Sequence, residues 1–354
     1  MPKVEQTVVF TQEPAQQLDE LVGALQADRV FLLVDENTRR HCLPRMSEAR
    51  CLQGVNPIVI GATDVHKNLD TLVHVWQSLQ QGGASRRSCL VCLGGGMVTD
   101  LGGFAAATFK RGIRCVNLPT TLLSMVDAAV GGKTGINFGG LKNEIGVFRQ
   151  PEAVIIDTGF LRTLDDENLR SGYAEMLKHG LIASESAWAE LLRFDLDHVD
   201  FGQLQRLVEK SIGVKERIVD QDPTERGLRK ALNLGHTAGH ALESLALAGQ
   251  HPVLHGYAVA WGLACELYLS VVKAGFPQDM MRQTVQFVQR YYGTMGIQCK
   301  EYDRLFDYMK HDKKNVGGVI NFTLLRAPGD ILLDQTATQE EIFEMFDFFR
   351  ESLG

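Results

Sequence analysis

The chain has 354 residues, of which 45% are hydrophobic and 22% charged, and its formal net charge is −7. These values are those of an ordinary globular protein, and the length predicts two domains. The acidic balance argues against a nucleic-acid partner, although a few local Lys and Arg can still bind a small anion. No apolar run reaches the roughly 18 residues of a membrane span. The N-terminus also lacks the apolar core of a signal peptide, so we expect a cytoplasmic protein without a membrane partner.

The first half of the chain alternates short apolar runs with segments of helical length. The runs are apolar on both faces and end in turn or glycine residues, which is typical of a parallel sheet covered by helices on both sides. Two of the intervening segments, 67–81 and 97–109, predict helices. The predicted strands lie within 29–38, 56–62, 88–96, 113–121 and 152–158.

From about residue 160 the pattern changes to helical periodicity. One β-like stretch, 317–334, interrupts it. We therefore expect an α/β domain over 1–159, followed by a mainly helical domain over 160–354. The predicted helices of the second half are 165–183, 186–194, 201–220, 236–249, 257–274, 278–296 and 338–352.

The seven cysteines are odd in number and scattered, which fits a reducing cytoplasm. Cys89 and Cys92 form a CxxC inside the apolar stretch "SCLVCLGGG". That setting indicates a buried strand, so packing is favoured over a metal or redox role.

A glycine-rich turn, "LGGGMVTDLGGF", follows one predicted strand and begins a helix. Glycine lets the backbone approach a phosphate, and a helix N-terminus binds anions. The dinucleotide fingerprint G-x-G-x-x-G is not met, because Gly94 and Gly96 are followed by Thr99. Asp35, at the end of another strand, is the candidate for a ribose contact. From these residues alone, nucleotide binding and a tight structural turn are equally supported.

Two lysines lie beside flexible glycine backbone in the stretch 118–148. Lys133 follows Gly131–Gly132, and Lys142 follows Gly139–Gly140. This arrangement suits a phosphate or carboxylate, whereas a single lysine of this kind would more often be a solvated hairpin residue. The pair favours an anion site.

Histidines and acids gather in the second half as candidate metal ligands. His236 and His240 are four residues apart, so a helix would show both on one face. Glu175 and His179 are also spaced for one helix face, and His255 follows soon after the first pair. A catalytic zinc site needs three N or O ligands and an open position, but spacing alone does not choose among these groups.

Several blocks of sequence together resemble the 3-dehydroquinate synthase family. They include "GGGMVTDLGGFAAATFKRG", "LPTTLLSMVDAAVGGKTGIN", "SGYAEMLKHG", "NLGHTAGHALE" and "LHGYAVA". The resemblance implies a Rossmann-like NAD-binding domain and a helical domain that binds a divalent metal, zinc or cobalt, and the substrate. The implied reaction converts 3-deoxy-D-arabino-heptulosonate 7-phosphate to 3-dehydroquinate and phosphate in the shikimate pathway. It proceeds by NAD-mediated oxidation, phosphate β-elimination, reduction, ring opening and intramolecular aldol closure.

The resemblance also implies roles for individual residues. Glu175, His236 and His255 match metal ligands, and His240 matches a catalytic histidine that does not bind the metal. Arg111 resembles a phosphate-binding arginine that the partner subunit of a homodimer supplies. The matches to substrate-handling positions are Lys133, Lys142, Asn143, Lys178, Lys215, Arg229, Asn233 and Lys313.

For NAD, the matched residues follow several of the predicted strands. Asp64, Asn168 and Tyr257 each stand where the family commonly has Glu. These departures concern the fine geometry of the ligand contacts and not the set of metal ligands. The matched positions are Asp35, Asn37, Asp64, Lys67, Gly95, Gly96, Met97, Val98, Thr99, Asp100, Thr120, Thr121, Asp127, Lys133, Lys142, Phe160, Leu161, Arg162 and Thr163.

Three other functions share some of these features. A sister sugar-phosphate cyclase that makes an inosose or a valiolone would share the fold, NAD and metal. Its substrate lacks the carboxylate for which Arg229 is suited. A metal-dependent polyol dehydrogenase would release NADH, and the dense Lys and Arg argue against a neutral substrate. A catalytically inactive nucleotide-binding protein would be expected to have lost the candidate ligands, which are present.

Overall fold

The computed structural model describes residues 7–310 and 319–353, and the chain divides into two compact units, Met1–Asp165 and Asp166–Gly354. The boundary expected between residues 159 and 160 falls inside the short helix Thr158–Thr163. That helix stays with the first unit because Asp157 accepts a hydrogen bond from the Gly159 backbone N–H and pairs with Arg45. Lys313 lies outside the described residues.

A six-stranded parallel sheet forms the centre of the first unit. All five predicted strands are present, and β1 is an additional edge strand. The central strand β4 is buried along its whole length, because its apolar residues face helices on both sides of the sheet. In spatial order the strands are β1 (Thr7–Phe10), β8 (Ala153–Ile156), β5 (Arg114–Pro119), β4 (Cys89–Gly94), β2 (Val30–Asp35) and β3 (Ile58–Ile60).

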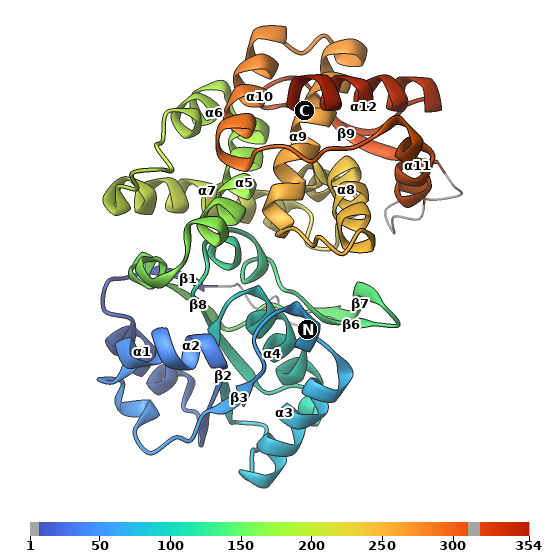
Figure 1. Ribbon diagram of the computed structural model, residues 1–354. Coiled ribbons are helices and arrows are strands. Elements are labelled where there is room, and N and C mark those ends of the chain that lie inside the picture. Colours follow the sequence, from blue (N-terminus) through green and yellow to red (C-terminus); the bar gives the residue numbers. More distant parts are fainter. Residues whose placement is uncertain (1–6, 311–318, 354) are drawn as a thin grey trace. The chain divides into compact units, whose positions relative to one another are not determined.

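Helices cover both faces of this sheet, which confirms the predicted α/β class. A right-handed crossover places its helix on one face of the sheet when the chain moves one way across the strands. It places the helix on the other face when the chain moves the opposite way. Figure 1 accordingly shows α1 and α2 on one side of β2 and β3, with α3 and α4 on the other. The bounds are α1 (Pro14–Leu25), α2 (Glu36–His41), α3 (Leu69–Gln81) and α4 (Gly96–Thr108).

The glycine-rich stretch after β5 forms an antiparallel hairpin of β6 (Lys133–Phe138) and β7 (Leu141–Phe148). Gly139 and Gly140 make its turn with φ of 59° and 83°. Tight two-residue hairpin turns need this left-handed backbone, which glycine adopts without strain. The turn therefore places Lys142 in β7 two residues after the glycines.

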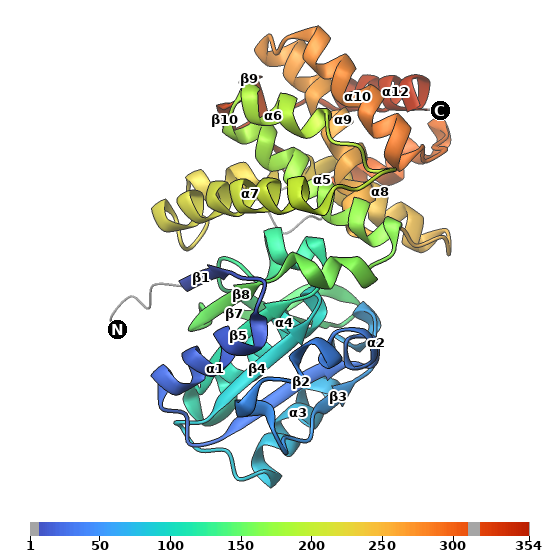
Figure 2. The same cartoon turned by 90° about the vertical axis from the view of Figure 1, so that its left-hand side faces the viewer.

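The second unit is mainly helical, as predicted. Its central helix α9 packs against α5, α8, α10, α12 and β9. Length and composition alone would allow α9 to cross a membrane, but 67% of its most apolar window is buried, as in the core helix of a globular domain. The helices are α5 (Asp166–Ala183), α6 (Glu185–Leu192), α7 (Phe201–Gln221), α8 (His236–Ala248), α9 (His255–Ala274), α10 (Gln278–Tyr292), α11 (Tyr302–Lys310) and α12 (Gln339–Leu353), and the strands are β9 (Asn321–Ala327) and β10 (Asp330–Thr336). Figure 2 shows this unit from a second direction.

Cys89 and Cys92 lie inside β4 with no exposed surface. The Cys92 sulfur is 3.8 Å from the sulfur of Cys115 on the neighbouring strand, and all seven cysteines are free thiols. The interpretation of the CxxC as core packing is therefore confirmed.

Candidate active site

The residues matched to NAD contacts gather where parallel strands end. Asp35 ends β2, Asp64 follows β3, Gly95 follows β4, Thr120 follows β5 and Phe160 follows β8. Because the strands are parallel, these positions share the carboxyl edge of one sheet. The chain order reverses between β2 and β4, which pair directly, and ligands of open α/β sheets bind at such a point.

The glycine-rich turn connects β4 to α4 as the sequence predicted. Gly95 caps α4 with its backbone in an extended conformation, so the first N–H groups of the helix are available to an anion. A side chain on Gly94 would collide with Val98, so glycine is needed for the tight packing of helix against strand. The strand–turn–helix context supports phosphate binding, although the full dinucleotide fingerprint is absent.

Asp35 has a structural partner as well as a place at the carboxyl edge. Its Oδ1 accepts hydrogen bonds from the backbone N–H (2.7 Å) and hydroxyl (3.1 Å) of Thr38. This caps α2, and the carboxylate also interacts favourably with the positive end of the helix dipole. The cap fixes the orientation of the carboxylate at the sheet edge.

A hydrogen-bonded network joins the turn after β3 to the β6–β7 hairpin. The buried Lys67 ammonium donates to Asp100 and to the Asn143 side chain. Asn137 donates to Asp64 (3.0 Å) and accepts from the Asn143 backbone N–H (2.9 Å). Candidate cofactor residues and a candidate substrate residue thus hold one another in place. Asn137, which the sequence analysis missed, is the link between them.

The remaining candidates at this edge divide into two groups. Phe160 and Leu161 are 2% and 1% exposed, so their side chains belong to the core. Thr121 forms a local turn in which it exchanges hydrogen bonds with Ser124, just before the π-helical turn that contains Asp127. The candidate residues Asn37, Met97, Val98, Thr99 and Arg162 lie in or beside the helices that begin at this edge, α2, α4 and the turn Thr158–Thr163.

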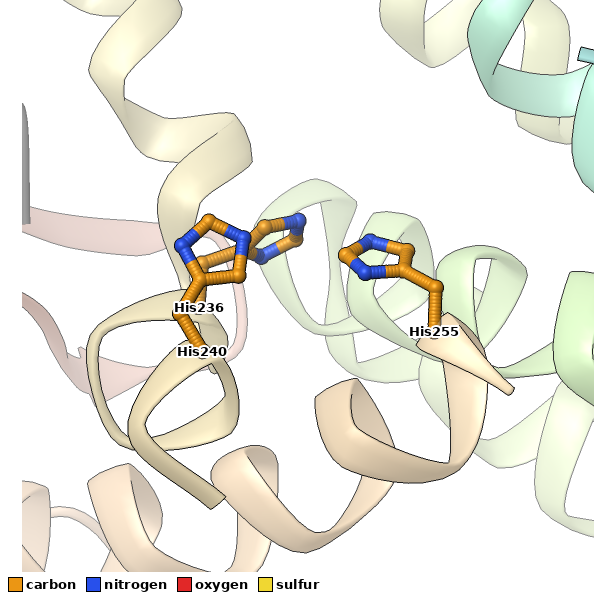
Figure 3. A group of neighbouring side chains, drawn as sticks. All are labelled: His236, His240 and His255. Carbon is orange, nitrogen blue, oxygen red and sulfur yellow. The ribbon is translucent and has the colours of Figure 1, made fainter. Parts of the chain in front are cut away.

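In the second unit, three histidines converge from two helices. His236 and His240 come from the first turns of α8, and His255 is the first residue of α9. Figure 3 shows their rings turned toward a common space. The ring centroid of His236 is 5.3 Å from that of His240 and 5.4 Å from that of His255.

Glu175 of α5 brings a carboxylate to two of these rings. Its Oε1 lies 3.4 Å from His236 Nε2 and 3.5 Å from His255 Nε2, and its Oε2 pairs with Lys178. The carboxylate is fully buried. Burial alone would raise the pKa of Glu175, but the Lys178 ammonium and the His236 imidazole hold it well below the usual value. Glu175 is therefore an anion.

These atoms fit a divalent metal. Tetrahedral zinc with bonds of about 2.0–2.2 Å holds its ligand atoms about 3.3–3.5 Å apart, which is the spacing of Glu175 Oε1 from the two Nε2 atoms. Glu175 Oε1 is buried and has no hydrogen-bond partner among the described residues. A bound cation would satisfy this oxygen.

The two candidate ligand imidazoles are oriented by hydrogen bonds from their other ring nitrogen. His236 Nδ1 lies 3.1 Å from the Leu234 carbonyl oxygen, and His255 Nδ1 lies 3.4 Å from Glu243 Oε2. Such partners fix the tautomer that leaves Nε2 for a metal. Glu243 was not among the residues predicted from the sequence, although it lies three residues after His240 on the same helix.

His240 lies close enough to be an alternative ligand. One ring nitrogen from each of His236, His240 and His255 lies within 4.8 Å of the other two. The geometry therefore allows either three histidines or Glu175 with two histidines. The buried oxygen of Glu175 and the oriented imidazoles favour the second set.

Three candidate substrate cations are buried in the second unit. Lys178, Lys215 and Arg229 are 1%, 5% and 2% exposed. Arg229 is held by hydrogen bonds to the Pro223 carbonyl (2.8 Å) and to Asp222. Asn233 Nδ2 donates to Glu225 at 3.0 Å. Lys178 is already paired with Glu175, so the ammonium and guanidinium groups of this unit both balance a buried carboxylate and offer donors of the kind that bind an anionic ligand.

Arg111 of the first unit lies in a strained surface segment. Lys110 and Arg111 both have left-handed backbone, with φ of 51° and 69°. Non-glycine residues in this region cost about 1–3 kcal/mol each and cluster at functional sites. With Arg86 and Ser85 they line a basic surface pocket.

Two solved structures share this fold. A 2-deoxy-scyllo-inosose synthase in complex with carbaglucose-6-phosphate, NAD+ and Co2+ has a TM-score of 0.84 and 22% identity, covering 97% of this chain and 96% of its own. A 2-epi-5-epi-valiolone synthase from Streptomyces hygroscopicus with NAD+ and Zn2+ has a TM-score of 0.83 and 25% identity, covering 99% and 98%. The fold is that of these sugar-phosphate cyclases.

Sequence comparison then identifies the family. Residues 57–171 match the 3-dehydroquinate synthase N-terminal domain, and residues 172–315 match the C-terminal domain. The 3-dehydroquinate synthase of Parabacteroides distasonis is 51% identical over 350 residues, which cover 99% of each chain. The chain belongs to the 3-dehydroquinate synthase family.

Metal uptake should release protons from this site. Burial lowers the pKa of His255, but the carboxylates of Glu175 and Glu243 outweigh it and raise the pKa to about 10. At pH 8 the metal-free imidazole is therefore protonated, and it must lose its proton to bind a metal. We expect about one proton per zinc from His255, measured by calorimetry in buffers of different ionisation enthalpy. Zinc binding at this pH without release of a proton would contradict the assignment.

Proposed function

We propose that this protein converts 3-deoxy-D-arabino-heptulosonate 7-phosphate to 3-dehydroquinate and phosphate, as a carbon–oxygen lyase acting on phosphates. The observation that carries the proposal is the convergence of Glu175, His236 and His255 at metal-ligand spacing in a unit that also buries three cations. The 51% identity to a 3-dehydroquinate synthase supports the particular substrate.

The cofactors follow from the candidate residues of the two units, each taken by itself. When bound, a divalent metal polarises the substrate hydroxyl as a Lewis acid, and NAD accepts and later returns a hydride. Glu175, His236 and His255 would hold the metal, zinc or cobalt. The carboxyl edge of the first unit would hold NAD, with the N-terminus of α4 at its phosphates and Asp35 and Asp64 at its ribose hydroxyls.

The cations would bind a substrate that carries a carboxylate and a phosphate. Arg229 is buried and anchored by its Nη1, and a guanidinium can pair with a carboxylate through two parallel hydrogen bonds. Lys133, Lys142, Asn143, Lys178, Lys215, Asn233 and Lys313 are the other proposed substrate residues.

His240 would handle a proton rather than the metal. The proposed ligands already number three, and a Lewis-acid site must keep its remaining positions for substrate oxygens. His240 is one turn along α8 from His236, and its ring centroid is 5.8 Å from that of His255. An imidazole at that place can accept or donate a proton near neutral pH.

We further propose a cytoplasmic homodimer in which Arg111 contributes to the site of the partner subunit. The strained backbone at Lys110–Arg111 supports a functional role for that segment. The seven free thiols agree with a reducing compartment.

The two rival enzymes are less well supported. A valiolone synthase shares the fold at 25% identity, half of the identity to the 3-dehydroquinate synthase. A polyol dehydrogenase acts on neutral substrates, which do not need the cationic side chains that match substrate positions here, such as Lys215 and Arg229.

The reaction itself is tested by following phosphate and NADH in one assay. With the heptulosonate phosphate, metal and NAD+, we expect continuous phosphate release that needs added NAD+ but builds up no NADH, because the hydride is returned. Stoichiometric accumulation of NADH would instead assign the protein to the dehydrogenases.

Carboxylate recognition is tested with Arg229→Lys. Loss of the paired hydrogen bonds should cost about 1.5–3 kcal/mol in kcat/KM. Lys230→Arg is a matched control, because Lys230 pairs with the exposed Asp334. Unchanged kcat/KM in Arg229→Lys, or better turnover of sedoheptulose 7-phosphate by the unmodified enzyme, would favour the sister cyclase.

The roles of the two histidines on α8 are separated by measuring metal content beside turnover. We expect His236→Ala to lose bound metal. His240→Ala should keep the metal and lose about 10²-fold or more in kcat. Metal loss from His240→Ala would make it a ligand, whereas near-normal turnover would make it structural.

Sharing of Arg111 between subunits is tested by mixing inactive variants. Arg111→Ala and His236→Ala place their defects in different halves of a shared site, so a mixed dimer contains one intact site. Random pairing of equal amounts should restore roughly a quarter of the normal activity. Glu175→Ala mixed with His236→Ala is the control and should restore none. Absence of recovery in the first mixture would place Arg111 in its own subunit's site, whereas normal activity of Arg111→Ala alone would place it outside any site.

A further inference from the structure

Glu266 is a carboxylate in the middle of the core helix α9 and has no exposed surface. It lies in the apolar run "AWGLACELYLS". A buried carboxylate is costly unless hydrogen bonds replace its water. Neither the metal ligands nor the proposed substrate contacts include it.

The carboxylate of Glu266 accepts hydrogen bonds from the start of α8. The backbone N–H of Gly235 donates to Oε2 at 2.6 Å, and those of Thr237 and Ala238 donate to Oε1 at 2.9 and 3.1 Å. The first N–H groups of a helix have no partner within the helix, and a negative charge there is favourable. Gly235 occupies the N-cap position of α8 but has no side chain that could accept these hydrogen bonds, so Glu266 of another helix accepts them.

These bonds fix the backbone on both sides of His236. Gly235 is left-handed, with φ of 78°, and Thr237 follows the histidine directly. A side chain at Gly262 of α9 would overlap the Gly235 carbonyl oxygen, so the two helices are in backbone contact at this point. His255 begins the same helix that carries Glu266. One helix thus supplies one imidazole and holds the backbone of the other.

We propose that Glu266 is a positioning residue for the metal site, which sets the distance of His236 from His255 and Glu175 by capping α8. This inference rests on the proposed ligand set. It predicts that the cap exists before metal binds and that its loss weakens metal binding rather than the chemical step.

The test is Glu266→Gln, which keeps the side-chain volume but replaces one accepting oxygen with a donor. We expect zinc affinity, measured by chelator competition, to fall 10- to 100-fold, as for other groups that orient metal ligands. The metal concentration for half-maximal activity should rise by the same factor, while kcat at saturating metal stays within a few-fold of normal. Amide hydrogen exchange within 232–240 should become faster.

Thr284→Val is the matched control. The buried Thr284 hydroxyl accepts a hydrogen bond from Trp188 Nε1 at 2.9 Å and lies on α10 of the same unit. Its loss should lower the melting temperature without changing zinc affinity or exchange within 232–240. Normal zinc affinity in Glu266→Gln, or an equal loss in Thr284→Val, would overturn the proposal.

A measurement on the unmodified enzyme covers the case in which Glu266→Gln does not fold. In the metal-free enzyme the amides of Gly235, Thr237 and Ala238 should already be protected from exchange, because Glu266 rather than the metal holds them. Protection that appears only with metal would refute the proposal. Zinc affinity and amide exchange are both measured without substrate, so failure of the proposed activity would be seen separately in the phosphate assay.

Discussion

The buried carboxylate of Glu175 is the group on which the helical unit depends. It is surrounded by Lys178 and by the imidazoles of His236 and His255, which come from three helices in all. Removing one member of such a cluster leaves an uncompensated buried charge, which costs several kcal/mol. The packing of α5, α8 and α9 is thus tied to the electrostatics of one carboxylate. Close backbone contacts at Gly262 and the cap from Glu266 hold α8 and α9 at the separation that this cluster needs.

In the first unit the constraint is the topology of the sheet. Its candidate residues differ in type and share only their position at the carboxyl edge of the sheet. Asp35, Gly95, Thr120 and Phe160 follow four different strands, and only the parallel direction of those strands brings them to one edge. Their side chains also carry local structure, as in the cap that Asp35 makes for α2. The network around Lys67 and Asn137 extends this edge onto the β6–β7 hairpin. Position in the topology therefore matters more here than residue type.

Much of the fold was predictable because the apolar segments differ in length and in the residues that end them. The apolar run of β4 is as short as a strand and ends in glycines, whereas the apolar segment of α9 is too long for a strand. The helix α11 was not predicted, and neither was β1, whose four residues are only partly buried. In the candidate site, motifs indicated the residues that would meet a ligand.

The residues that orient those ligands could not be predicted in the same way. Glu266 and Gly235, or Asn137 and Asp64, are neighbours only in the folded chain. No local pattern records such a pairing. One signal was nevertheless available, since a single acid in an apolar helix such as α9 must have a buried partner.

The pairing of β1 with β8 has a consequence for how the chain is made. Thr7 lies opposite Ala153, so the first strand of the sheet pairs with its last. During synthesis β1 must wait without that partner while β2, β3, β4 and β5 emerge, and closing so long a loop is slow. The same late strand carries the turn Thr158–Thr163, the last part of the carboxyl edge to be completed. A nascent chain that stalls before residue 153 therefore has an unpaired strand edge at β5, which is a site for aggregation.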